Sequence, residues 1–234
     1  MKEKNSLSYR LYGKKTLEKV QTKIDLLGYK NKYTAETYLN IRYLSSIFIF
    51  FMILYIADAG YIWAPIITGI YFFLFPVFTI DKKINKRREV LDNDALYFFE
   101  VLTLSLESGR SLKNALEVTA NNIDSELSLE FRYALDTMKY GKSLSEALND
   151  LKKRIPSDTI NNIILNAEQS NIFGSSIIET MYNQIEYIRD KQIMDTKAKI
   201  NKIPIKISVI SVLFFIPLIM LLILSPVILN LIGG

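Results

Sequence analysis

Three long stretches of this chain carry no charged side chain, and they limit the fold more than any other feature. They cover residues 43–57, 59–80 and 207–234 of the 234-residue sequence. The second and third exceed the roughly 20 apolar residues that a helix needs to cross a bilayer. We therefore expect an integral membrane protein with three transmembrane helices.

The first charge-free stretch has 15 residues, which is short for a span. Taken alone, it is also consistent with a buried core helix. Arg42 lengthens it if the guanidinium group reaches the lipid headgroups. Since only Asp58 separates it from the second stretch, we predict a transmembrane hairpin over residues 43–80. The third transmembrane helix is predicted over residues 204–232.

Basic residues mark one side of these stretches. Residues 1–42 form a basic arm, and five cations directly follow the hairpin: Lys82, Lys83, Lys86, Arg87 and Arg88. The positive-inside rule then places residues 1–42 and 81–203 in the cytoplasm, and the C-terminus outside the cell membrane. We treat the five cations as candidates for docking a partner or the membrane surface.

The composition excludes several classes of function. The sequence has no Cys and no His. This removes disulfides, Cys/His zinc sites and imidazole acid–base catalysis, and we predict no catalytic residues, no metal and no cofactor. Residues 81–203 carry 18 basic and 19 acidic side chains. This near balance favours a protein partner over nucleic acid, which selects basic surfaces.

Between the second and third spans, apolar residues recur at helical spacing and are interrupted by Gly, Pro, Ser and Asn. The pattern predicts an all-α fold with a cytoplasmic six-helix bundle. The predicted helices cover residues 85 or 95–108, 112–121, 126–140, 144–155, 158–170, and 176 onward into the third span. The domain formed by residues 81–203 would then be tied to the membrane at both ends.

The arm contains an amphipathic helix of its own. Its apolar face consists of Leu17, Val20, Ile24 and Leu27, lysines flank this face, and Gly28 ends the helix. Such a helix either lies on the cytoplasmic leaflet or packs on the bundle.

One eight-residue pattern occurs twice, GRSLKNAL at residues 109–116 and GKSLSEAL at residues 141–148. We predict that each glycine ends a helix in the left-handed conformation and that each serine caps the next helix. The apolar positions then share the core face of that helix. These structural roles are assigned to Gly109, Ser111, Leu112, Ala115, Leu116, Gly141, Ser143, Leu144, Glu146, Ala147 and Leu148, with a weaker third copy at Gly174 and Ser176.

The second copy includes Gly-Lys-Ser, which also ends a phosphate-binding loop. That signature requires a glycine at position 136, where the chain has Asp136, and a strand before the loop, where a helix is predicted. We therefore interpret the pattern as architecture, with Glu146 completing a capping box at Ser143. A nucleophilic serine paired with a neighbouring lysine stays an alternative that no other feature supports.

Several motifs occur in a familiar order. After the hairpin and its basic stretch come SGRSLKNAL at residues 108–116, the pair Ala167-Glu168, and Lys202–Pro204 before the last span. This order resembles the type II secretion system F-domain family, and it is closest to the TadB/TadC-like proteins of Flp (tight-adherence) pilus assembly. Relatives commonly have a glycine shortly after the Ala-Glu pair, where this chain has Asn171, a residue that also tolerates positive φ.

The resemblance implies a non-catalytic platform protein of the inner, cytoplasmic membrane. Its bundle would meet a hexameric secretion ATPase, and motor movement would extract pilin subunits from the lipid bilayer for filament assembly. A paralogous platform protein or a homo-oligomer is implied as well, because larger family members contain two copies of the domain.

Three alternatives stay open. A sporulation-type branch of the same family builds a transport channel. A membrane-bound enzyme could use Glu100 and Glu107, which are seven residues apart on one helix face, although such pairs usually mark a solvated face. A small transporter is disfavoured because no charged side chain lies deep in a predicted span.

Overall fold

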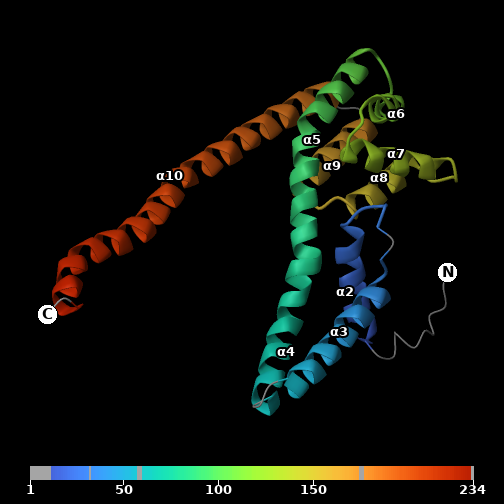
Figure 1. Ribbon diagram of the computed structural model, residues 1–234. Helices are drawn as coiled ribbons and strands as arrows, with labels where there is room; N and C mark the ends of the chain where they lie inside the picture. Colours follow the sequence, from blue (N-terminus) through green and yellow to red (C-terminus); the bar gives the residue numbers. More distant parts are fainter. Residues whose placement is uncertain (1–11, 32, 57–59, 174–176, 233–234) are drawn as a thin grey trace. The chain divides into compact units, whose positions relative to one another are not determined.

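The computed structural model describes residues 12–31, 33–56, 60–173 and 177–232, and within these ranges it contains helices and no strand (Figure 1). In chain order the elements are α2 (Lys14–Asp25), α3 (Ala35–Ile56), α4 (Gly60–Pro76), the π-helical turn η1 (Val77–Asp81), α5 (Lys82–Glu107), α6 (Leu112–Asn122), α7 (Glu126–Met138), α8 (Leu144–Lys152), α9 (Asp158–Phe173) and α10 (Ile177–Ile232). The all-α prediction is confirmed, and the six predicted bundle helices correspond to α5–α10.

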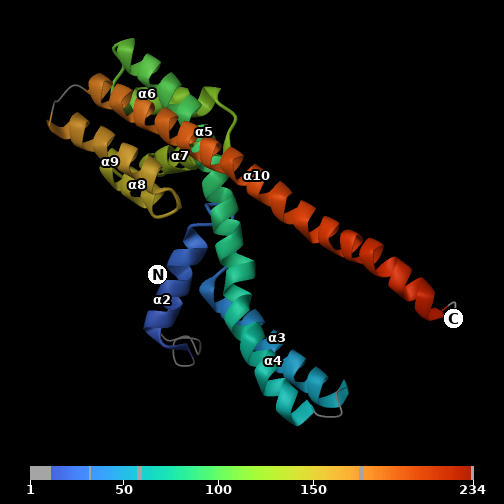
Figure 2. The same cartoon turned by 90° about the vertical axis from the view of Figure 1, so that its left-hand side faces the viewer.

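Three helices are long and apolar enough to cross a membrane: Ala35–Ile56, Tyr61–Glu107 and Ile177–Leu224. Most side chains of their apolar windows are exposed. An outward-facing apolar surface is stable in lipid and unstable in water, so the chain is a membrane protein. Helices α3 and α4 pack along each other as the predicted hairpin (Figures 1 and 2).

A proline in the hairpin explains where Arg42 goes. Pro76 has no N–H, so the carbonyl of Phe72 loses its helical partner. The Nη2 atom of Arg42 donates to this carbonyl at 2.8 Å, and the guanidinium group lies 3.7 Å from the centre of the Phe72 ring. Arg42 therefore joins α3 to α4 in addition to marking the end of the charge-free stretch.

The arm helix α2 packs against the base of the hairpin, beside α3 and the start of α5 (Figures 1 and 2). Its Leu17 and Ile24 are buried together with Leu39 of α3 and Ile80 of η1. The apolar face of α2 is thus covered by the hairpin base, a contact that neither predicted position included, and its location at the cytoplasmic leaflet stays a prediction.

The bundle core is built mainly from α5, α6, α7, α8 and α9. Phe98 of α5 and Phe131 of α7 stack with ring centres 4.6 Å apart. The other large side chains buried there include Phe99, Leu102, Leu127, Leu148, Leu151, Ile160 and Ile163. Burial of such side chains stabilises a fold by about 1.5–3 kcal/mol each, so this core is the main favourable contribution to packing the short helices together.

The chain forms two compact units, Met1–Ile185 and Glu186–Gly234. The first contains the arm, the hairpin and the bundle, together with the first turns of α10, where Met181 is buried. Helix α10 then continues through the second unit, and its exposed apolar residues there form the third candidate span.

Candidate functional site

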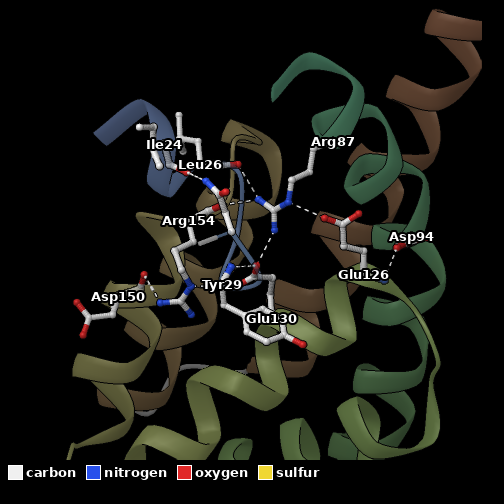
Figure 3. A network of polar contacts seen from close by, with 10 residues as sticks. Ile24, Leu26, Tyr29, Arg87, Asp94, Glu126, Glu130, Asp150 and Arg154 are labelled. Carbon is white, nitrogen blue, oxygen red and sulfur yellow. Dashed lines mark hydrogen bonds and ion pairs between the residues drawn. The ribbon is translucent and has the colours of Figure 1, made fainter. Parts of the chain in front are cut away.

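Four charged side chains form a network inside the first unit, beside the arm (Figure 3). Arg87 of α5 donates to Glu126 and, at 2.7 Å, to Glu130, both of α7. Arg154, which follows α8, donates from Nε to the second oxygen of Glu130 at 3.0 Å. The side chains of Arg87 and Glu130 are only 7% and 2% exposed. The buried Arg87 and the partly buried Arg154 thus balance two carboxylates.

The network holds the arm by its backbone. Arg87 Nη1 donates to the carbonyl of Leu26 at 2.8 Å, and the N–H of Tyr29 donates to Glu130 at 3.0 Å. The Tyr29 ring stacks on Tyr133 of α7 with ring centres 5.0 Å apart. The loop after α2 is therefore bound to the bundle through two backbone groups and the Tyr29 ring, and we call this set of contacts the arm clasp.

Gly28 lies at the centre of the arm clasp. Its φ of +94° is in the left-handed region, which residues with a Cβ avoid. A Cβ atom at this position would lie 2.6 Å from Glu130 Oε1 and 2.7 Å from Arg87 Nη2. Both the backbone conformation and the lack of space require glycine here.

Neighbouring contacts extend the clasp along α5. Lys23 of α2 pairs with Asp81 at 2.8 Å. Asp94 of α5 accepts a hydrogen bond of 3.1 Å from the N–H of Glu126, the first residue of α7. These contacts connect the arm, the start of α5 and the bundle.

The sequence carried a signal for this network that was missed. Glu130 belongs to the apolar face of α7, at helical spacing from Leu127, Phe131 and Ala134. Arg87 similarly follows Ile84 on the buried face of α5. A charge on a core face requires a buried partner of opposite charge, so these two positions predict each other once the helix faces are drawn.

The two turns of the repeated pattern have the predicted geometry. Gly109 and Gly141 have φ values of 82° and 93°. Ser111 accepts a hydrogen bond from the N–H of Asn114 at 3.4 Å. Ser143 accepts from the N–H of Glu146 at 3.2 Å, and the Glu146 carboxylate accepts the Ser143 N–H at 2.8 Å, which confirms the capping box.

The core positions of the pattern also lie where predicted. Leu112, Ala115, Leu116, Ala147 and Leu148 are buried, and Leu144 is half-buried. The hydrogen bonds from the Ser143 backbone and hydroxyl hold the pKa of Glu146 below its usual value. Its carboxylate is therefore charged at the positive end of α8, where a negative charge is stabilising.

A family model described as "Type II secretion system (T2SS), protein F" matches residues 98–226, more than half of the chain. The chain belongs to the T2SSF family. The closer likeness to TadB/TadC-like proteins rests on the sequence motifs alone. No curated protein and no solved structure matches the chain.

The residues of the arm clasp lie on both sides of the boundary where the T2SSF match begins. Glu126, Glu130 and Arg154 lie inside the matched residues, whereas Gly28 and Arg87 precede them. The clasp thus joins the matched bundle helices to the arm and to the start of α5, which precede the match.

The third copy of the turn pattern lies partly outside the described residues, and the helix before it is longer than predicted. Gly174 and Ser176 lie outside the described residues. Helix α9 runs to Phe173, so Asn171 lies within this helix and not at a turn after Ser170. Since α9 continues for another turn of helix, Asn171 does not need positive φ.

The lysine of Gly-Lys-Ser, Lys142, forms an ion pair within the protein. Lys142 pairs with Asp150, and Lys153 pairs with the same carboxylate at 2.8 Å. Hydrogen bonds from Lys142 and then Lys153 lower the pKa of Asp150 to about 2. With its charge balanced in this way, Lys142 fits a surface ion pair better than a phosphate site.

The five cations after the hairpin fall into two groups. Lys82, Lys83 and Lys86 are exposed, and the Lys82 ammonium lies 3.9 Å from the centre of the Phe78 ring. Arg87 is buried in the clasp, and Arg88 donates to the carbonyl of Pro156. Arg87 is therefore an internal residue, and its assignment as a docking residue is corrected.

The carboxylates proposed for an alternative enzyme do not form a common site. Glu107 accepts a hydrogen bond from the hydroxyl of Tyr182, and this contact raises the pKa of Tyr182. Glu100 lies two turns away on the same helix and is half-buried. Across the described residues, no group of three acidic side chains is placed to hold a metal ion.

Proposed function

We propose that this T2SSF protein is a non-catalytic platform of a type IV or Flp pilus, or of a T2SS-like secretion machine. The family membership and the three apolar helices support a membrane platform. The arm clasp is the observation that carries the mechanical part, because it adds a second connection between bundle and hairpin beside the α4–η1–α5 helix.

In this proposal the arm and the bundle lie in the cytoplasm and the C-terminus lies outside. A hexameric secretion ATPase contacts the bundle, and its movement reaches the hairpin through α5 and the clasp. Pilin subunits are then extracted from the bilayer beside the hairpin. A paralogous platform protein or a second copy of this chain completes the assembly.

The direct test is copurification with the cognate secretion ATPase. The detergent-solubilised chain, carrying an affinity tag, is expected to retain the ATPase, whereas an unrelated membrane protein with the same tag does not. Failure of the intact chain to bind the ATPase, with and without nucleotide, would contradict the proposal.

The role of the clasp needs a second experiment. Gly28→Ala opens the clasp without changing any residue of the bundle surface. We expect the variant to retain the ATPase and to lose filament assembly or secretion in cells. A variant that still assembles filaments at the normal rate would show that force does not pass through the clasp.

A further inference from the structure

The base of the hairpin has two sides on which the exposed apolar surface ends at different heights. On one side α2 runs antiparallel to the start of α3. The Ala35 N–H donates to Gln21 at 3.0 Å, and the Tyr12 hydroxyl donates to Asn40 at 2.7 Å. Tyr12 also stacks on Tyr43, with ring centres 5.2 Å apart. Helix α2 therefore covers α3 from Ala35 to about the level of Tyr43.

The outer face of α2 is polar over this whole length. Lys14, Lys15, Glu18 and Lys19 are exposed, while the apolar Leu17 is buried against the hairpin base. A helix face with three lysines is not stable in hydrocarbon. On this side the hydrocarbon of the bilayer can begin only beyond the level of Tyr43.

The face of α4 and η1 turned away from α3 is apolar, in contrast to the polar outer face of α2. The bond from Arg42 to Phe72 places these two residues at one level. Beyond that level, toward α5, Phe73, Val77 and Phe78 remain 77%, 40% and 56% exposed. Six residues of helix extend the apolar surface by about 9 Å on this side.

The lysines of α2 and those at the start of α5 also lie at different heights along the hairpin. Lys14 and Lys15 come directly after Tyr12, which contacts Asn40 and Tyr43 on either side of Arg42. Lys82, Lys83 and Lys86 instead follow the Phe73–Phe78 face along the chain. The Lys82 ammonium over the Phe78 ring marks the end of that face. If the bilayer met the hairpin at right angles, either the lysines of α2 would enter hydrocarbon or the Phe73–Phe78 face would enter water.

We propose that the hairpin crosses the cytoplasmic leaflet at a slant, so that both groups of lysines contact acidic phospholipid headgroups and the Phe73–Phe78 face contacts acyl chains. A step of about 9 Å across a width of about two helix-packing distances corresponds to a tilt of roughly 25°. Transmembrane helices commonly tilt by up to about 40°.

Charge complementarity selects acidic lipids as the occupant. Lys15, Lys19, Lys83 and Lys86 have no ion-pair partner among the described residues. Each lysine held near an acidic membrane surface contributes about 1 kcal/mol of attraction. This inference concerns membrane insertion and does not depend on the proposed motor.

The depth of two matched positions tests the slant. The chain has no cysteine, so Lys15→Cys and Phe73→Cys each give one labelling site, and both lie near the level of Arg42. Each variant is labelled with a small fluorophore in nanodiscs of phosphatidylcholine and phosphatidylglycerol. We expect aqueous iodide to quench the label at position 15, and bromine on the acyl chains to quench the label at position 73.

Phe48→Cys and Ile66→Cys serve as a control pair, deeper in the hairpin and on its two helices. Both are expected to respond to the brominated lipid. Equal iodide quenching at positions 15 and 73 would overturn the slant. Resistance of position 73 to both quenchers would show that a protein helix covers this face, which overturns the assignment to lipid.

The headgroup contacts are tested by charge removal. Changing four unpaired lysines to glutamine (Lys15, Lys19, Lys83 and Lys86) is expected to lower the phosphatidylglycerol retained on purification several-fold, measured by lipid mass spectrometry. A control removes the same charge from the bundle at Lys113, Lys139, Lys142 and Lys153. Equal retention in the two variants would overturn the acidic-lipid assignment.

Discussion

Gly28 and Gly141 have almost the same backbone conformation, with φ values of 94° and 93°, in two very different surroundings. A Cβ on Gly28 would meet two charged side chains closer than 3 Å, whereas a Cβ on Gly141 would meet no atom within 4 Å. The first glycine is required by the conformation and by the close approach of the arm. The second is required by the conformation alone.

The charges beside the two glycines differ in the same way. In the arm clasp the ion pair of Arg87 with Glu130 is almost fully buried. At the Gly141 turn the side chains of Lys142 and Asp150 are 45% and 34% exposed. Water screens the second pair, so it contributes at most about 1 kcal/mol, whereas breaking a buried pair leaves an uncompensated charge. Burial thus decides which of two similar-looking regions holds the fold together.

The largest expected effect comes from removing the central cation of the clasp. Arg87→Met leaves Glu130 buried with one cation partner fewer, and it frees the carbonyl of Leu26. We expect a loss of about 3–5 kcal/mol of unfolding free energy. Pulse proteolysis of the full chain in detergent measures this loss.

Lys86→Met is the matched control, because it removes a neighbouring but exposed cation of α5. We expect its effect to stay within about 0.5 kcal/mol. Similar stabilities of the two variants would mean that the buried network contributes no more than the surface pairs.

The two glycines themselves provide the next test. Gly28→Ala and Gly141→Ala both force alanine into the left-handed region, at about 1–2 kcal/mol each. Only Gly28→Ala also displaces Arg87 or Glu130, and losing one charge-assisted hydrogen bond adds about 1.5–3 kcal/mol. Gly28→Ala should therefore expose the loop after α2 to protease, while Gly141→Ala should not. Equal losses of stability would show that the arm adapts to the extra methyl group.

Local patterns were sufficient to predict most of the bundle. Helical spacing of apolar residues gave α5–α10, and the Gly-x-Ser turns gave the ends of α5 and the starts of α6 and α8. These features depend on residues that are close in sequence, so propensity and capping rules apply directly. The same rules ended this helix near Ser170, whereas α9 continues to Phe173 and includes Asn171, the position where relatives commonly have glycine.

The arm clasp was beyond those rules because its partners are far apart in sequence. Arg87 appeared as one of five cations after the hairpin. Its place three residues after Ile84 indicated a buried face, but the sequence did not show that the partners are Glu130 and the Leu26 carbonyl. The backbone of the arm supplies the bonded groups, and a backbone group leaves no pattern in a sequence. The contact of Arg42 was not predicted for a related reason, since Pro76 on the other helix leaves the Phe72 carbonyl free to accept it.

The smallest effect distinguishes the two copies of the turn pattern. Ser143→Ala removes a reciprocal capping box and should cost about 1 kcal/mol, measured by hydrogen exchange of the first amides of α8. Ser111→Ala removes one longer bond of 3.4 Å and should cost less. Neither the parent chain nor the variants should bind a fluorescent ATP analogue, because Lys142 is paired with Asp150. ATP affinity that disappears in Ser143→Ala would restore the phosphate-binding interpretation of Gly-Lys-Ser and make the exposed turn, not the buried clasp, the chemical centre of the bundle.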